Sequence, residues 1–235
     1  MKSILLGFAV ALAICTQSLQ AALLQVQEDR RGIHCWAVPD VSGQPWKQYI
    51  NFVEDNPPTP FSDSHIMTTA RDTATYSCSA SLTAYYGPDF LRCSGASAAT
   101  CLGSPIGGAN ACAEAIASFI FTLDKPTPFQ LTATLNTNSN EGASASTWLY
   151  SYYPGGYLIF NYTTGYVGTT VAVSDSGVLQ PGTYGFASSI NASVENILAY
   201  YQASITDLEF RLTPEPTSLA LLALGGLVLI RRARK

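Results

Sequence analysis

Much of the chain consists of short runs in which hydrophobic and polar residues alternate. Residues 118–123 and 129–135 place Phe, Leu or Ala at every second position. A period of two, rich in aromatic and β-branched residues, is typical of a half-buried strand. The intervening residues 125–128 read Lys-Pro-Thr-Pro, which has the composition of a turn. The two runs are therefore predicted to form a β-hairpin.

Further strands are predicted along most of the chain, and turns containing Gly or Pro separate many of them. They cover residues 73–86, 146–153, 157–162, 166–173, 183–188 and 198–212. Only two stretches suggest a short helix, the Ala-rich residues 111–117 and residues 193–200. This pattern predicts an all-β fold, an antiparallel β-sandwich of jelly-roll-like type with eight or more strands.

Residues 29–66 read differently from the rest. They contain Asn56-Pro57-Pro58-Thr59-Pro60 and few sustained hydrophobic runs. Proline removes a backbone donor and is poorly tolerated inside a sheet. We therefore expect this N-terminal segment to be a long loop, or an extension along the edge of the sandwich.

The N-terminus has the order of a secretory signal peptide. Lys2 precedes an apolar run at residues 4–14, and the small residues Ala21 and Ala22 follow a polar stretch. A charged start, a hydrophobic segment of about 7–15 residues and small residues near the cut are the parts of such a peptide. Residues 1–22 are predicted to direct export and to be removed by a signal peptidase.

The C-terminus combines a short uncharged segment with a basic cluster. Pro214, Glu215 and Pro216 precede the uncharged residues 219–230, and the chain closes on the cations Arg231, Arg232, Arg234 and Lys235. Counted from Thr217, a helix rising about 1.5 Å per residue reaches about 21 Å, short of a hydrocarbon core of about 30 Å. Arg and Lys at the cytoplasmic headgroups would nevertheless anchor it. A short transmembrane helix is therefore predicted here.

This order of parts resembles the PEP-CTERM sorting tail of bacterial envelope proteins. The resemblance implies that an exosortase-type membrane protease recognises Pro214, Glu215 and Pro216 and removes the hydrophobic tail. It also implies a place at the cell surface or in an exopolysaccharide matrix. The alternative is a plain tail anchor that is retained. Either way, residues 23–213 form the predicted ectodomain and residues 214–235 the tail.

Composition and charge narrow the choice of partner. Charged residues make up 12% and hydrophobic residues 47% of the chain, which argues against a disordered protein. The net charge of the whole chain is −4, but residues 22–213 hold seven basic and fifteen acidic residues, a net charge of −8. An acidic exported domain disfavours nucleic acid and favours a neutral or cation-bridged polymer as its neighbour.

Five cysteines remain after the signal peptide, namely Cys35, Cys78, Cys93, Cys101 and Cys112. Disulfides are the usual use of cysteine in an exported chain, and five thiols allow two bridges with one left over. Cys93 with Cys101 or Cys112 is the best local pair, and Cys35 with Cys78 is a second possibility.

No cofactor and no metal site is predicted from the sequence. The cysteines include no C-x-x-C pair, and His34 and His65 lack metal-ligand spacing. Asp63, Asp72 and Asp89 could contribute to a Ca²⁺ site, but they lack the spacing of a known calcium loop.

The sharpest candidate for ligand binding is aromatic. Trp148, Tyr150 and Tyr152 recur with a period of two and should share one face of a strand. Exposed, they would form flat platforms suited to sugar rings. Aromatic residues of a sandwich more often fill its core, so both alternatives stay open.

The sequence contains no G-x-S-x-G elbow and no P-loop. The predicted function is thus a non-catalytic surface or matrix protein that binds carbohydrate. The alternative is a secreted hydrolase acting on polysaccharide.

Overall fold

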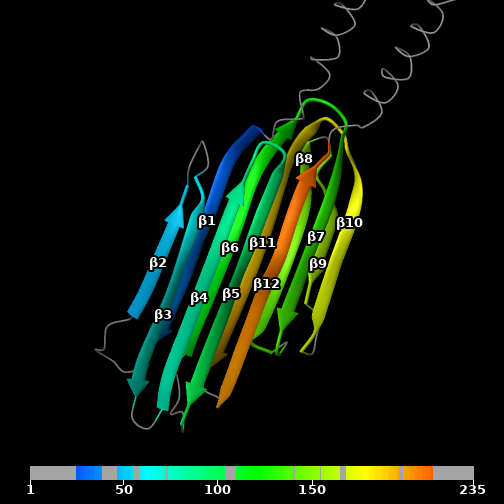
Figure 1. Ribbon diagram of the computed structural model, residues 1–235. Helices are drawn as coiled ribbons and strands as arrows, with labels where there is room; N and C mark the ends of the chain where they lie inside the picture. The colour runs from blue at the N-terminus through cyan, green and yellow to red at the C-terminus, as the bar shows by residue number, and fades with distance from the viewer. Residues whose placement is uncertain are drawn as a thin grey trace, which may run out of the picture.

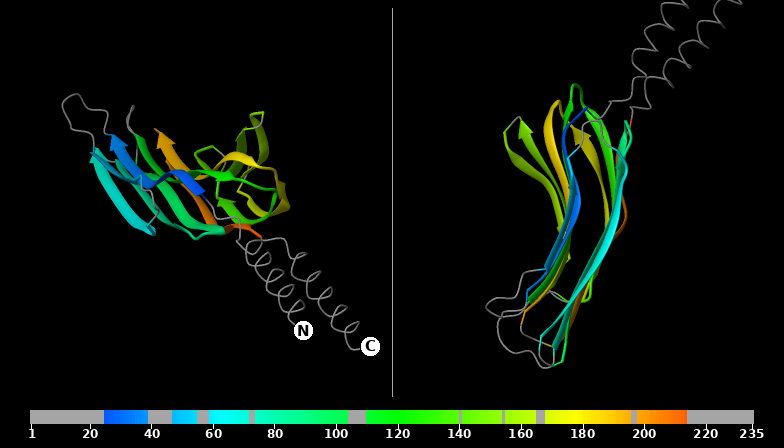
Figure 2. Two further views of the ribbon diagram at one scale, coloured as in Figure 1. Left: turned by 90° about the horizontal axis from the view of Figure 1, so that it is seen from above. Right: turned by 90° about the vertical axis from the view of Figure 1, so that its left-hand side faces the viewer.

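The computed structural model describes residues 25–38, 47–54, 59–71, 74–103, 110–139, 141–153, 155–164, 168–195 and 198–213. These residues form two six-stranded antiparallel sheets that pack face to face as an elongated sandwich (Figures 1 and 2). The predicted antiparallel β-sandwich is therefore confirmed. The predicted signal peptide and sorting tail lie outside the described residues. Within those residues there is no helix that is long and apolar enough to cross a membrane.

Each sheet is built from strands that are distant in sequence. Sheet A has the spatial order β2 (Lys47–Val53), β1 (Gln25–Val38), β6 (Asn110–Leu123), β11 (Gly182–Glu195), β8 (Ala143–Tyr153) and β9 (Tyr157–Thr163). Sheet B has the order β10 (Thr170–Leu179), β7 (Thr127–Thr137), β12 (Ala199–Leu212), β5 (Phe90–Leu102), β4 (Ala74–Tyr86) and β3 (Phe61–Arg71). The chain repeatedly crosses from one sheet to the other, so most neighbours within a sheet are far apart along the chain.

The core lies between the two sheets and follows the alternation seen in the sequence. Phe119 and Phe186 from sheet A stack with ring centroids 5.2 Å apart, and Phe210 of sheet B lies 5.2 Å from Phe186. Phe121 and Phe129 also contact Phe210, each at 5.9 Å. Packed aromatic pairs of this kind stabilise a core beyond the area they bury. The aromatic positions of the two alternating runs therefore join the sheets.

The predicted hairpin between residues 118–123 and 129–135 is wrong, although both runs are strands. β6 lies in sheet A between β1 and β11, whereas β7 lies in sheet B between β12 and β10. Residues 124–126 connect them across the sandwich. The alternation predicts which side of each strand is buried, but it does not specify whether the next strand pairs beside it or packs opposite it.

The two predicted helices are also strands. The Ala-rich residues 111–117 belong to β6, in which Ala111, Ala113, Ala115 and Ala117 are buried against sheet B. Residues 193–200 include the end of β11 and the start of β12. Ala favours a helix in an isolated peptide. Here β6 pairs with β1 on one side and β11 on the other, and this pairing outweighs the helix preference of Ala.

Residues 29–66 are not a long loop in their described parts. They contain most of β1, all of β2 and the start of β3, and only β2 and β3 lie at sheet edges. The sequence of β1 lacks a clear alternation because two charged residues, Asp29 and Arg31, occupy core-facing positions. Arg31 is completely buried and its guanidinium lies 2.6 Å from the carboxylate of Asp29, which is also buried. Arg31 also donates to the backbone carbonyls of Thr59 and Ala84.

Candidate functional site

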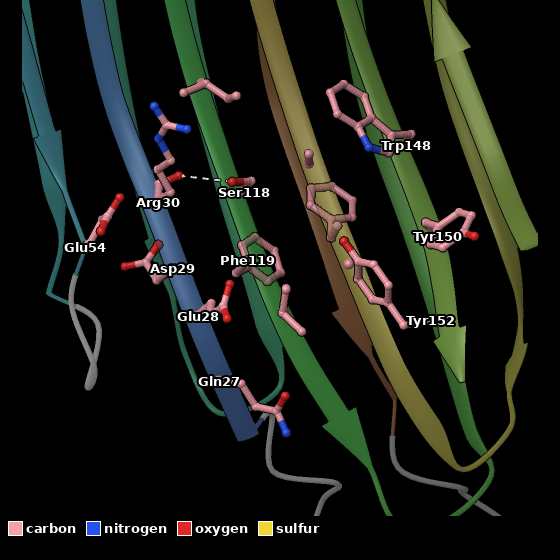
Figure 3. A pocket seen from close by; sticks show the side chains of 15 residues that line it. Gln27, Glu28, Asp29, Arg30, Glu54, Ser118, Phe119, Trp148, Tyr150 and Tyr152 are labelled. Carbon is pink, nitrogen blue, oxygen red and sulfur yellow. Dashed lines mark hydrogen bonds between the residues drawn. The ribbon is translucent and has the colours of Figure 1, made fainter. Parts of the chain in front are cut away.

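A groove of about 640 Å³ lies on the outer face of sheet A, the side turned away from sheet B. It runs across strands β1, β6, β11 and β8 (Figure 3). The side chains of β8 form one wall, and those of β1 and the residue after β2 form the other. The floor between them is formed by Ile116, Ser118 and Ile120 of β6 and by Gly185 and Ala187 of β11. The groove is thus assembled from strands that the chain places far apart in sequence.

The aromatic wall consists of Trp148, Tyr150 and Tyr152. The residues between them, Thr147, Leu149 and Ser151, are fully buried, so the aromatic row faces outward, away from the core. Trp148 and Tyr150 are half-buried, whereas 54% of Tyr152 is exposed. The rings of Tyr150 and Tyr152 meet edge to face with centroids 5.2 Å apart. Of the two alternatives from the sequence, the structure places these residues on the surface.

Gly185 of β11 allows the Tyr152 ring to lie down across the floor. A Cβ atom at Gly185 would lie 2.7 Å from Cε2 of Tyr152 and 3.1 Å from its hydroxyl oxygen. A Cβ atom essentially never lies within 3.0 Å of another heavy atom, so any larger residue at this position must displace the ring. Gly185 is not among the site residues predicted from the sequence. A glycine inside a strand often marks a close approach of this kind, and that signal could have revealed it.

The polar wall is formed by Gln27, Glu28 and Arg30 of β1 together with Glu54. The guanidinium of Arg30 packs 4.7 Å above the ring centroid of Phe52, which holds it at the rim. The backbone carbonyl of Arg30 accepts a hydrogen bond of 3.5 Å from the Ser118 hydroxyl on the floor (Figure 3). The wall offers carboxylate and amide acceptors beside amide and guanidinium donors. Sequence reasoning missed it because no strand was predicted before residue 73, and residues 29–66 were expected to be a long loop or an edge extension.

The five described cysteines are all buried, and no disulfide joins any two of them in the part of the chain that the structure describes. Cys93 and Cys101 cannot form the predicted bridge, because they lie eight residues apart in β5, about 26 Å along an extended strand. A disulfide requires Cα atoms about 4.4–6.8 Å apart.

The other local pair is wrong for the same reason. Cys93 contacts Ser188, whose register partner on β6 is Ala117, five residues or about 17 Å from Cys112. Burial raises the pKa of Cys93 to about 11 and that of Cys112 to about 12, so both stay protonated at neutral pH.

The residues considered for metal binding serve other contacts. Asp63 accepts hydrogen bonds from the Tyr49 hydroxyl at 2.8 Å and from Asn51 at 2.7 Å. Burial works against its ionisation, but these hydrogen bonds outweigh burial and lower the pKa of Asp63. His65 stacks on Tyr49 at 3.8 Å and His34 contacts Trp36 at 4.4 Å.

Asp89 lies in the turn before β5, where its backbone carbonyl accepts a hydrogen bond from Leu212, and Asp72 lies outside the described residues. In the part of the chain that the structure describes, no three His, Cys, Asp or Glu side chains cluster to hold a metal ion.

Comparison with solved structures finds distant likenesses. A CBM4 structure is 7% identical, with a TM-score of 0.30, over 55% of this chain and 78% of that one. The enzymatically active domain of tailspike protein 4 from bacteriophage CBA120 is 13% identical, with a TM-score of 0.26, over 64% of this chain and 19% of that one. TmCBM61 in complex with beta-1,4-galactotriose is 10% identical, with a TM-score of 0.23, over 65% of this chain and 88% of that one. At these values the likenesses say nothing about ligand or activity.

The comparison with curated proteins finds no match. Residues 212–235, in contrast, match the PEP-CTERM protein-sorting motif, and the match includes Pro214, Glu215 and Pro216. The predicted resemblance of the tail is thus confirmed. The chain is an exported protein with a C-terminal PEP-CTERM sorting motif, which is recognised by an exosortase and provides a membrane anchor before cleavage.

Proposed function

We propose that this protein is a non-catalytic component of the cell surface or extracellular matrix and that the groove of sheet A binds a neutral polysaccharide chain. The observation that carries the proposal is the outward row of Trp148, Tyr150 and Tyr152. Residues on one side of a strand repeat about every 6.6 Å, so the row spans about 13 Å. Aromatic faces along that length offer apolar platforms for successive sugar rings, with a hydroxyl or indole N–H at the edge.

The opposite wall supports the same class of ligand. A sugar chain lying on the aromatic row would present its hydroxyl groups to Gln27, Glu28 and Arg30, which accept and donate hydrogen bonds. All these residues stand on paired strands, so the site is held in shape before a ligand arrives. A preformed site loses less conformational entropy on binding.

Charge favours a neutral polymer over an acidic one. The exported domain carries a net charge of −8, and the groove itself holds Glu28 and Glu54 against Arg30. A surface field of that sign repels polyanions and lowers their local concentration. An exopolysaccharide without carboxylate, sulfate or phosphate groups therefore suits the groove best.

The proposal is tested with the polysaccharide made by the producing cells. Trp148→Ala and Tyr150→Ala should each weaken retention on it by about tenfold, the effect of losing a well-buried aromatic contact. Tyr200→Ala is the matched control, because Tyr200 is about half exposed on the outer face of sheet B. Retention by affinity electrophoresis and thermal unfolding are measured for all three variants.

Unchanged retention in both groove variants, with unfolding temperatures like that of the wild type, would overturn the proposal. The same samples distinguish the alternative of a secreted hydrolase. Release of new reducing ends from the polysaccharide by the wild-type protein would show catalysis, whereas a constant number supports binding alone.

A further inference from the structure

Two cysteines from different sheets meet in the core. Cys35 of β1 is 0% exposed and Cys78 of β4 is 2% exposed. The Cys78 thiol donates a hydrogen bond of 3.4 Å to the backbone carbonyl of Trp36, the residue that follows Cys35. The Cys35 thiol donates at 3.9 Å to the carbonyl of His65, whose register partner, Ala80, is two residues from Cys78. The Cys78 sulfur therefore lies against the residue next to Cys35, and the Cys35 sulfur lies against β3 at a position two residues in register from Cys78.

The two sheets lie close together where β1 packs on β4. Packed sheets are typically about 10 Å apart, whereas Cα atoms of β1 and β4 come within 8 Å of one another. The contact between the Cys78 sulfur and the Trp36 carbonyl belongs to this part of the core. On the inner side of each sheet the register partners are small, with Ala113 opposite Cys35 and Ala99 opposite Cys78, whereas Tyr49 and Met67 oppose them on the edge strands. Interaction with the other thiol is the main cause that lowers the pKa of Cys35 and raises that of Cys78.

We propose that Cys35 and Cys78 form a disulfide that joins the two sheets in the exported protein. The inference is independent of the function proposed for the groove. Disulfides persist in the oxidising compartments that an exported chain enters. Each thiol loses its proton, an S–S bond forms, and the two electrons reduce a disulfide of an oxidising thiol partner to two thiols. Both sulfurs are buried, so oxidation accompanies folding.

The bond would stabilise the edge of the sandwich that β2 and β3 form. The loop between the two cysteines contains β2 and β3, the edge strands on one side of the molecule (Figure 1). Each of these strands is paired on one side only. A disulfide that closes the loop from Cys35 to Cys78 stabilises the fold, chiefly by restricting the conformations of the unfolded chain. The other three described cysteines remain thiols in this assignment.

The chain's own trypsin sites make the pairing directly measurable. Cleavage after Arg31 and Lys47 isolates Cys35 in residues 32–47, and cleavage after Arg71 and Arg92 isolates Cys78 in residues 72–92. Cys93, Cys101 and Cys112 remain together after Arg92. The protein is isolated from exporting cells with free thiols blocked and digested without reductant. We expect one linked species that joins the two isolated peptides and blocked thiols on the other three cysteines.

A second measurement tests the consequence for stability. Reduction should lower the unfolding temperature of the wild-type protein by about 5–15 °C. Cys35→Ala and Cys78→Ala should abolish that sensitivity to reductant. Cys101→Ala removes another buried thiol from the same core, and the unfolding temperature of this variant should still fall on reduction. Blocked thiols on both Cys35 and Cys78 in the wild type, or a linkage of either to Cys112, would overturn the assignment whether or not the variants fold.

Discussion

The two outer faces of the sandwich follow the same alternating pattern but carry different side chains. The outer face of sheet A is hollowed and presents Trp148, Tyr150 and Tyr152 opposite charged residues. The outer face of sheet B carries small polar and apolar side chains along the middle of β4 and β5. The outward residues there are Thr75, Ser77, Ser79, Ser81 and Thr83 on β4, and Ser94, Ala96, Ala98 and Thr100 on β5.

The charged residues of β5 and β12 gather at one end of sheet B. Arg92 and Arg211 both bind Glu209 there, with nitrogen–oxygen distances of 2.8 Å and 2.6 Å. Between that end and the far ends of β4 and β5, the outward positions of these two strands carry no charge. The comparison teaches that the fold alone does not create a binding surface. The two faces differ in their outward residues. Sheet A presents a row of three aromatic side chains across a groove from polar groups, whereas a smaller hollow of about 320 Å³ on sheet B is lined by one aromatic residue, Tyr85, beside Arg92 and Glu209.

The largest expected effect comes from the buried ion pair beneath the charged wall. Arg31→Ala leaves the Asp29 carboxylate in the core without its guanidinium partner. Breaking a buried pair in this way should lower the free energy of unfolding by about 3–5 kcal/mol, measured by urea denaturation. Arg30→Ala, at the neighbouring exposed position, should cost less than about 1 kcal/mol. Equal losses for the two variants would mean that the ion pair does not hold β1 in sheet A.

An intermediate effect is expected at the floor of the groove. Gly185→Ala places a methyl group where the Tyr152 ring lies, so the ring must move. Retention on the polysaccharide should weaken by about 3–10-fold, or about 1 kcal/mol. In a Tyr152→Ala background the same glycine substitution should have no further effect. If it weakened binding equally in both backgrounds, Gly185 would act by a route other than Tyr152.

The smallest effect on retention is predicted for a substitution on sheet B. It tests directly whether the two outer faces differ in binding. Ser79→Lys introduces a charge at the centre of its outer face, whereas Ser118→Lys makes the same change in the groove. Ser79→Lys should leave retention within about twofold and stability within about 0.5 kcal/mol of the wild type. Ser118→Lys should reduce retention several-fold. Similar losses of retention in the two variants would show that the faces do not differ in function.

The sequence predicted the fold class because the buried positions of most strands are apolar. It also showed that Trp148, Tyr150 and Tyr152 share one face of a strand, since a period of two is a local property. It could not show whether that face points inward, because side orientation depends on the partner strands. Strand pairing across the sandwich is a non-local property, as the wrong hairpin of β6 and β7 illustrates.

The polar half of the groove was missed for a different reason. β1 was not recognised as a strand because Asp29 and Arg31 occupy buried positions where the pattern calls for apolar residues. They are tolerated because they pair with each other and because Arg31 also donates to the backbone carbonyls of Thr59 and Ala84. Strand propensity describes single residues. It does not show that a charged residue at a buried position is compensated by a partner elsewhere in the chain.

The position of β12 determines how this domain would carry a mechanical load. β12 is the last strand before the sorting motif, and it lies inside sheet B between β5 and β7. If the groove binds a polymer as proposed, a pull on that polymer before cleavage would reach the sorting motif through this strand, and its axial component would shear β12 against both neighbours. The hydrogen bonds to both neighbours then resist shear together, whereas an edge strand would peel away one bond at a time.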